Sequence, residues 1–338
     1  MEKYIKKIII GRNKYKIELP NNLIIAPMAG ITDRSFRNLQ YNLSNISLVF
    51  NEMVSAKALS YDDEKTWDML KPFDGEEKRN RGIQLFGSDP EDFFEAIKKI
   101  KEKKLNIDII DINAGCPAPK ITKSGSGCFL LKDLENLREI AKRSRAVWDK
   151  ILSFKIRIGI DEKNIIALDI CKILEEEGID FITIHARTYE GKFYSDVNYE
   201  EIKKVKENIK IPIFFNGNIF KFEDAKKALE KTNADGIAIA RGAYSNPFLA
   251  RDILSEKDKK ISKSELLKVI EMHFKLNIKY LGEERGTKEF RKNLIWYSRF
   301  FSRSNVLRSK ISELKDEKSF EIFLSEMKKL EMKEKEEN

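Results

Sequence analysis

The sequence predicts an α/β protein, a closed (β/α)8 barrel followed by a smaller all-helical C-terminal domain. Short apolar runs rich in β-branched residues recur along the first part of the chain, with helix-like polar segments between them. This alternation is the pattern of a parallel sheet. Eight such units in about 230 residues match a closed barrel better than an open doubly wound sheet. The runs stop near residue 250, so we expect a barrel over 1–250 and a helical domain over 251–338.

The individual elements follow from the apolar pattern. The expected strands are Leu23 to Met28, Ser47 to Val54, Arg81 to Phe86, Ile107 to Ala114, Leu152 to Gly159, Phe181 to Thr188, Ile211 to Gly217 and Gly236 to Gly242. The expected helices between them include Asp92 to Lys104, Leu134 to Val147, Asn164 to Glu177 and Phe222 to Lys231. Ser88 and Asp89 can cap the first of these, and Pro90 suits its first turn.

The two ends of the chain carry different patterns. Ile5 to Leu19 alternates around Gly11-Arg12-Asn13, which predicts a hairpin that plugs the lower end of the barrel. The C-terminal domain should contain a helix from Leu266 to Leu281, stopped by Gly282, and another from Thr287 to Phe301. The charged end, Met332 to Asn338, is expected to fray.

Composition narrows the class of protein. The chain has 338 residues, 41% hydrophobic, which is enough for a large core, and its net charge of +9 favours a polyanionic partner. Its three cysteines, Cys116, Cys128 and Cys171, contain no CxxC pair, which argues against a disulfide framework or a metal site. The cysteine pattern fits a reducing cytoplasm. Because neither a signal peptide nor an apolar run of about 20 residues is present, we expect a protein that is neither exported nor in contact with a membrane. We expect a monomer, since nothing in the sequence indicates a coiled coil or a large symmetric interface.

Nearly every expected strand ends in a reactive side chain. Barrels of this kind place their active sites at these strand ends. Lys155 and Arg157 lie two residues apart on one strand, and His185 and Arg187 on the next. Residues two apart share a face of a strand, so all four should point into the barrel mouth. Buried charges are costly unless a polar or anionic group meets them, so this pattern favours a bound ligand over a solvated rim.

The last two expected strands end in Asn216-Gly217-Asn218 and Ala240-Arg241-Gly242. Glycine lets backbone N–H groups approach a ligand closely, and the loops after the last two strands are the usual phosphate site of this fold. We therefore expect a phosphate here, with Arg241 completing its site.

Eight segments, in this order and spacing, resemble the tRNA-dihydrouridine synthases. They are APMAGITDRSFR at 26 to 37, EMVSAKAL at 52 to 59, IQLFGSDP at 83 to 90, INAGCPAPKITKSGSG at 112 to 127, KIRIG at 155 to 159, IHART at 184 to 188, NGN at 216 to 218 and ARGA at 240 to 243. The resemblance spans nearly the whole barrel. It implies a barrel with a helical domain that binds FMN, takes electrons from NADPH or NADH, and reduces the 5,6 double bond of uridine in tRNA.

The resemblance also implies roles for single residues. Pro27, Met28 and Ala29 would line the flavin ring, Gln84 and Lys155 its polar edge, and Asn216, Gly217, Asn218, Ala240 and Arg241 the phosphate. Cys116 would be the proton donor, with Asn113, Arg157, His185 and Arg187 around the uracil or flavin. Asn218 stands where the family has Asp, and Ala240 where it has Gly, which affects only the detail of the phosphate loop.

A cysteine suits the chemistry that the resemblance implies. Hydride transfer to C6 of uracil builds negative charge at C5, which an acid must protonate from the other side. A thiol with an ordinary pKa of about 8.5 is protonated at neutral pH and can donate. Cys128 and Cys171 are expected to be structural.

A basic stripe is predicted beyond the barrel. If one helix continues through Arg303, then Lys288, Lys292, Arg299 and Arg303 share one face, and Phe290, Leu294, Tyr297 and Phe301 gather on the other. Such a stripe can neutralise RNA phosphates.

Two other interpretations remain open. One keeps the flavin barrel but changes the substrate to ribosomal RNA or to a small pyrimidine, as in dihydroorotate dehydrogenase-like enzymes; the basic tail argues against a small substrate. The other is a non-catalytic RNA-binding protein, against which the joint presence of Cys116, Lys155, His185 and Arg187 argues. The sequence does not reveal which uridine is modified.

Overall fold

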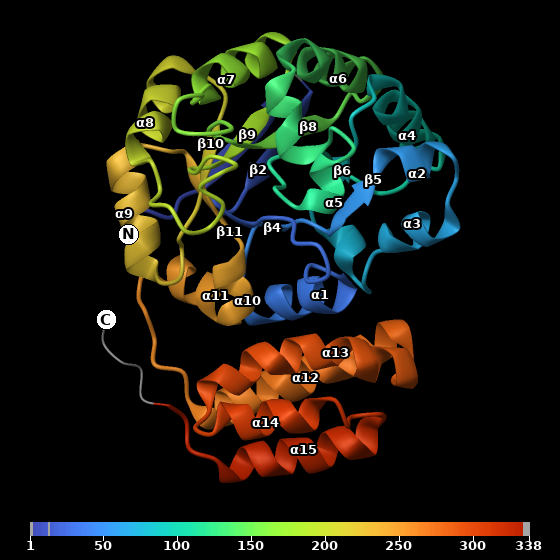
Figure 1. The fold of residues 1–338 in the computed structure, drawn as a ribbon, viewed down its shortest axis with the longest axis vertical. Coiled ribbons are helices and arrows are strands. Elements are labelled where there is room, and N and C mark those ends of the chain that lie inside the picture. The colour runs from blue at the N-terminus through green and yellow to red at the C-terminus, as the bar shows by residue number, and fades with distance from the viewer. Residues whose placement is uncertain (1–2, 13, 334–338) are drawn as a thin grey trace.

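The computed structural model describes residues 3–12 and 14–333. Parallel strands curl into a barrel with helices around it (Figure 1). The sheet has the order β4-β3-β11-β10-β9-β8-β7-β6-β5. Its strands are β3 (Leu23–Ile25), β4 (Leu48–Val49), β5 (Met53–Ser55), β6 (Gly82–Phe86), β7 (Ile109–Ala114), β8 (Ile151–Arg157), β9 (Phe181–His185), β10 (Ile213–Asn216) and β11 (Gly236–Ile239).

The expected strand from Ser47 to Val54 is broken into β4 and β5. β4 pairs with β3 through Ile24 and Leu48, and β5 pairs with β6 through Met53 and Gln84. Across the break, the N–H of Phe50 still donates to Ile25 at 3.0 Å. Both ends of the sheet therefore belong to one run of chain, which closes the ring, and the predicted (β/α)8 barrel is confirmed.

A hairpin seals the end of the barrel opposite the mouth. β1 (Ile8–Arg12) and β2 (Tyr15–Leu19) pair antiparallel, and Ile10 and Leu19 are fully buried in one cluster with Ile109 and Phe214 of the barrel. The predicted plug is confirmed. Its turn comes later than expected, because Arg12 already pairs with Tyr15, and Asn13 lies outside the described residues.

Helices cover the outside of the barrel, and the longer ones bury an apolar face against it. They are α1 (Arg34–Leu43), α2 (Ala56–Ser60), α3 (Glu64–Met69), α4 (Pro90–Glu102), α5 (Pro119–Thr122), α6 (Leu134–Val147), α7 (Ala167–Glu176), α8 (Tyr199–Asn208), α9 (Phe222–Thr232), α10 (Arg241–Ser245) and α11 (Leu249–Leu254), with 3-10 turns at Glu76–Lys78 and Gly127–Lys132. Asp89 caps α4 as predicted, whereas the Ser88 hydroxyl donates to Ser124 instead.

Some expected strands end earlier than predicted. The run from Phe181 to Thr188 is a strand only as far as His185, and the run from Gly236 to Gly242 only as far as Ile239. In the second case Arg241 already begins α10. The last polar residues of these runs therefore belong to loops and helix starts above the sheet, where the chain is free to turn toward or away from the mouth.

Four helices pack beside the barrel as a separate layer: α12 (Lys263–Leu281), α13 (Glu283–Tyr297), α14 (Ser304–Ile311) and α15 (Glu317–Lys329), with a 3-10 turn at Ser298–Phe300 (Figure 1). They share an apolar core in which the rings of Phe274 and Phe320 stack at 3.7 Å. α12 ends at Gly282 as predicted and lies against α1, where the Ser35 hydroxyl donates to Asn277 at 2.6 Å.

The C-terminal segment is only partly described. Met332 bridges to Phe301, so this residue is ordered against the helical layer, and residues 334–338 of the expected frayed end lie outside the described residues. Among the described helices, none has the length and apolar character needed to cross a lipid bilayer.

Candidate active site at the barrel mouth

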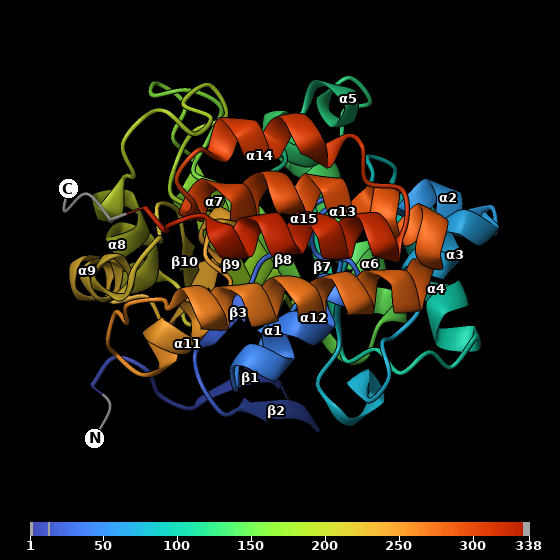
Figure 2. The ribbon, with the colours of Figure 1, turned by 90° about the horizontal axis from the view of Figure 1, so that it is seen from below.

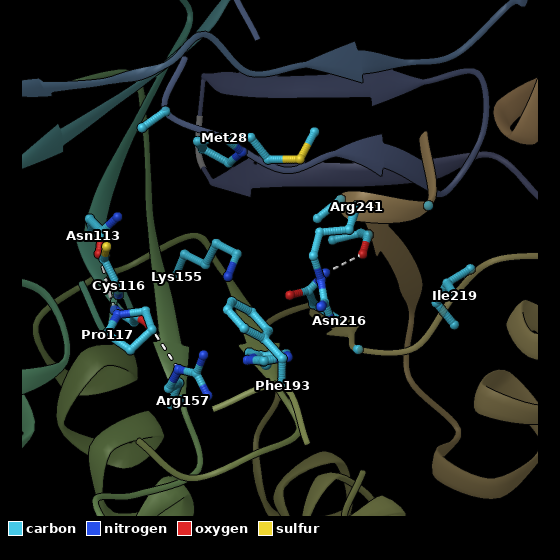
Figure 3. A pocket seen from close by; sticks show the side chains of 18 of the residues that line it. Met28, Asn113, Cys116, Pro117, Lys155, Arg157, Phe193, Asn216, Ile219 and Arg241 are labelled. Carbon is cyan, nitrogen blue, oxygen red and sulfur yellow. Dashed lines mark hydrogen bonds between the residues drawn. The ribbon is translucent and has the colours of Figure 1, made fainter. Parts of the chain in front are cut away.

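A cavity opens at the carboxyl ends of the strands (Figure 3). About 890 Å³ of free space lies between its walls, its open mouth included. Every residue expected to bind the cofactor lines it: Pro27, Met28, Ala29, Gln84, Lys155, His185, Asn216, Gly217, Asn218, Ala240 and Arg241. Asn113, Cys116 and Arg157 line it too, so residues from most of the chain meet in one place.

Positive charge dominates the cavity wall. Lys155 and Arg157 project from β8, and Arg157 stands opposite His185 in the register of β8 and β9. Burial lowers the pKa of Lys155 to about 8 and that of Arg157 to about 10. Burial and the neighbouring cations hold the pKa of His185 well below 6.5, so its imidazole is neutral at neutral pH. Within the described residues no carboxylate lines the cavity, so the wall suits a ligand rich in hydrogen-bond acceptors or negative charge.

One side of the cavity combines two uncommon backbone conformations with a partly buried arginine. Gly217 has φ +140°, and a Cβ there would meet Val197 Cγ1 at 2.9 Å, so a side chain does not fit. Asn218 has a left-handed backbone, φ 48°, which Asn tolerates better than most residues. Arg241 faces this side, and burial lowers the pKa of its guanidinium, a cost that a bound anion would offset. These features fit a phosphate.

The loop after β7 holds a half-buried thiol at the opposite wall (Figure 3). The Asn113 side-chain oxygen accepts from the backbone N–H of Gly115 at 3.1 Å and of Cys116 at 3.0 Å. Arg157 Nε donates to the Gly115 carbonyl at 2.9 Å, and the N–H of Cys128 donates to the Cys116 carbonyl at 3.0 Å. The backbone around Cys116 is therefore held from three sides.

Arg157 supports the site more than it reaches into it. Besides Gly115, its guanidinium donates to the carbonyls of Thr188 at 2.7 Å and Lys192 at 3.0 Å. These bonds tie the cysteine loop to the loop after β9. Arg157 therefore lines the cavity as predicted while its donors are largely committed to backbone.

Arg187 is not brought into the cavity wall. Because β9 ends at His185, the strand alternation that should have turned Arg187 inward no longer applies. Its Nε donates to the Ser195 carbonyl, and its buried Nη1 has no hydrogen-bond partner among the described residues. The structure places Arg187 behind the wall, beneath the loop after β9, and its expected contact with substrate remains a prediction.

Sequence reasoning missed several lining residues, of which Phe193 is the most prominent. It comes from the irregular loop after β9, and its ring lies 4.1 Å from the Arg241 guanidinium (Figure 3). An aromatic residue in a loop of irregular backbone gives no periodic signal. Met53, also missed, lies inside a segment quoted for the family resemblance, and that segment could have indicated it.

The predicted basic stripe is only partly formed. Phe290, Leu294, Tyr297 and Phe301 are buried as expected. The helix, however, ends at Tyr297, and Arg303 precedes α14 with a left-handed backbone, φ 53°. The reason is that Phe301 is buried in extended backbone bridged to Met332, which a continuing helix would prevent. Arg303 therefore does not continue the face of Lys288 and Lys292.

The burial of the two histidines of the chain can be tested through the pH dependence of the free energy of unfolding. Burial lowers the pKa of His273 to about 4, and that of His185 lies well below 6.5. Between pH 7 and pH 6 the unfolded chain therefore binds more protons, and the free energy of unfolding should fall by about 1 kcal/mol. Asp111, whose pKa burial raises to about 6, offsets part of this fall.

NMR of the imidazole protons checks the cause directly. Neither histidine should titrate between pH 8 and pH 6 in the folded protein, and both should titrate near 6.5 in urea. A folded-state midpoint near 6.5 for His185 would contradict its burial among cations.

Solved structures with similar folds include an old yellow enzyme homologue and morphinone reductase. The old yellow enzyme homologue from Zymomonas mobilis has a TM-score of 0.57 at 14% identity, covering 77% of this chain and 94% of its own. Morphinone reductase in complex with tetrahydroNAD has a TM-score of 0.51 at 13% identity, covering 74% and 91%. At such identities the likeness establishes the barrel fold alone.

Sequence comparison is more specific. Residues 24–333 match the family model described as dihydrouridine synthase. The chain is 33% identical to the probable tRNA-dihydrouridine synthase of Rickettsia conorii, over 94% of this chain and 98% of that protein. It is 35% identical to tRNA-dihydrouridine synthase B of Pasteurella multocida, over 95% and 97%. At the barrel mouth, a thiol held by its loop faces a cation-rich cavity. The chain belongs to the dihydrouridine synthase family.

Proposed function

We propose that this protein reduces the 5,6 double bond of uridines in tRNA, with FMN bound in the barrel mouth and NADPH as the reductant. One observation carries the proposal: Cys116 and the cations of Lys155 and Arg241 line the same cavity. The family of the chain and the printed names of its relatives supply the substrate class.

Different groups of cavity residues would contact different parts of the flavin. Pro27, Met28 and Ala29 would offer a mostly apolar surface for the ring, and Gln84 and Lys155, which line the same cavity, would supply donors to its polar edge. Asn216, Gly217, Asn218, Ala240 and Arg241 would hold the phosphate, with His185 as a neutral partner between the two ends. Bound there, the flavin supplies hydride for C6 of the uracil.

Residues of the chain would hold the proton and donate it to the uracil. Cys116 Sγ holds a proton that it delivers to C5 as negative charge develops there. Asn113 and Arg157 keep the loop of Cys116 in place, the first through two backbone N–H groups and the second through the Gly115 carbonyl. Lys155 places a positive charge near the same wall, which stabilises negative charge on the uracil as it builds.

Replacing Cys116 with alanine should separate binding from chemistry. Cys116→Ala should keep its flavin absorption and its reduction by NADPH, because the thiol lies away from the proposed phosphate side. Reoxidation of the reduced flavin by unmodified tRNA should slow by about 10²-fold or more, the usual contribution of a general acid. Stopped-flow absorbance under anaerobic conditions measures both steps.

The matched control is Cys171→Ala, at a fully buried cysteine on α7. It should reoxidise at the wild-type rate. Wild-type rates in Cys116→Ala would remove the thiol from the mechanism, and a wild-type protein that binds no flavin would contradict the proposal as a whole.

We also propose that the helical layer, α12 to α15, binds the tRNA. Figure 2 places α14 toward the same end of the molecule as α5, which follows the cysteine loop, with the hairpin at the other end and α13 between them. Lys288 and Lys292 are at least a third exposed and Arg299 lies 3.8 Å over the Trp296 ring. A basic surface on the mouth side can neutralise phosphates of an RNA whose uridine enters the cavity.

Charge reversal tests this surface. Changing Lys288, Lys292, Arg299 and Arg303 together to Glu should weaken tRNA binding at least about tenfold and flatten its dependence on salt, because fewer phosphate counterions are released. Fluorescence anisotropy with labelled tRNA at several salt concentrations measures both. Flavin content should not change.

The control reverses an equal charge elsewhere. Lys315, Lys318, Lys328 and Lys329 are exposed on or beside α15, which Figure 1 shows on the side of the helical layer away from the barrel. Changing these four to Glu should have the smaller effect. Equal losses in the two variants would mean that only net charge matters and would contradict a binding surface on α13 and α14.

A further inference from the structure

A chain of buried polar side chains runs beneath the cavity toward the cysteine loop. Asp111 Oδ2 accepts from Gln84 Nε2 at 2.6 Å, and Gln84 Oε1 accepts from Asn113 Nδ2 at 2.8 Å. Asn113 Oδ1 then accepts from the backbone N–H of Gly115 and Cys116. Gln84 and Asn113 line the cavity, whereas Asp111 lies below it and is 2% exposed.

The barrel strands bring these residues together. Gln84 and Asp111 are register partners on β6 and β7, and Asp111 and Asn113 are two residues apart on β7. Asp111 is also the partner of Ser153 on β8, whose hydroxyl donates to Asp111 Oδ1 at 2.6 Å. Both carboxylate oxygens are therefore bonded, and its negative charge faces the cation of Lys155 on the next strand.

The hydrogen bonds that link Asp111, Gln84, Asn113 and the cysteine loop can run in only one direction. An ionised carboxylate only accepts, so it must face the NH2 of Gln84, which turns the oxygen of Gln84 toward Asn113. Asn113 must then offer its own NH2 to Gln84 and its oxygen to the loop. At the far end, the backbone N–H groups of Gly115 and Cys116 only donate, so they need that oxygen. An amide flipped anywhere in the chain would leave buried groups unpaired.

We propose that Asp111 is a positioning residue for the proton donor: it fixes the amide orientations of Gln84 and Asn113, and through them the backbone of the Cys116 loop. The role of Cys116 as donor rests on the proposed function above. Asp111 acts through its neighbours, since it does not line the cavity itself. The same bond leaves Gln84 facing the cavity with a fixed donor, so one carboxylate orients both the flavin side and the thiol side of the site.

Two substitutions at Asp111 separate orientation from charge. Leucine at position 111, in Asp111→Leu, cannot accept a hydrogen bond from Gln84, so the series of hydrogen bonds loses its first acceptor. Asp111→Asn can still accept through Oδ1 while its NH2 donates to the Ser153 oxygen, so the direction of the chain is preserved without the charge. We expect Asp111→Leu to perturb the Cys116 loop and Asp111→Asn to restore it.

Thiol labelling reads the loop without need of flavin turnover or tRNA. Cys128 and Cys171 are fully buried, and burial raises the pKa of both, to about 12 for Cys128, so iodoacetamide should label Cys116 first. In protein as purified, Asp111→Leu should label Cys116 about threefold faster or more, because a loop without its anchor opens more often. Asp111→Asn should label within about twofold of wild type. Peptide mass spectrometry locates and times the label.

A second readout links the loop to the reaction. Flavin reoxidation by tRNA should slow roughly tenfold or more in Asp111→Leu, because a displaced donor loses its alignment with C5. The stability control is Asp180→Asn, which alters another buried carboxylate, bonded to Arg12 and Arg145 just before β9, at the end of the barrel opposite the mouth. It should lower the melting temperature without changing the labelling of Cys116.

The outcomes distinguish this proposal from the one it rests on. Wild-type labelling and reoxidation in folded Asp111→Leu would overturn the role of Asp111, as would an equal change in Asp180→Asn. If Asp111→Leu does not fold, Gln84→Leu interrupts the same chain one link later, and unchanged labelling there overturns the proposal. A wild-type protein that labels as expected but never reduces tRNA would contradict the proposed function alone.

Discussion

Closure of the sheet on itself is the constraint on which the rest of the molecule depends. The run that contains β4 and β5 breaks near Phe50, so that its first part pairs with β3 and its second with β6. A closed ring of parallel strands has a single mouth, where every strand delivers its last inward-facing side chain. Because this one run pairs with both ends of the sheet, no edge is left open there, and Gln84 and Arg241 line a common cavity.

The closed mouth also determines the electrostatics of the site. Lys155, Arg157 and Arg241 are held partly out of water in a wall that, within the described residues, contains no carboxylate. Such an arrangement costs stability when empty and is offset by an acceptor-rich ligand. A buried acid below the wall, Asp111, is used differently, because both of its oxygens are committed to Gln84 and Ser153. The cations that can meet a ligand and the carboxylate that orients neighbouring side chains are therefore different residues.

Much of this could be predicted from the sequence, for identifiable reasons. Apolar runs and Gly-containing strand ends have periodic or local signatures, so the barrel, the plug and the cavity residues from Pro27 to Arg241 were predictable. Strand ends were not, because β9 stops at His185 for reasons of tertiary packing, which leaves Arg187 behind the wall. The same holds for Arg303, displaced by the burial of Phe301, and for Phe193, whose loop has no regular period.

The central claim is that strand ends from the whole barrel build one seat for a flavin that carries a phosphate. Fluorescence titration of flavin-free protein with FMN and with riboflavin, which lacks the phosphate, tests it most directly. The account predicts one FMN per chain, riboflavin bound at least about tenfold more weakly, and an Arg241→Met variant in which this difference largely disappears, since a charge-assisted contact is worth about 1.5–3 kcal/mol. Equal affinity of the wild-type protein for FMN and riboflavin would contradict it.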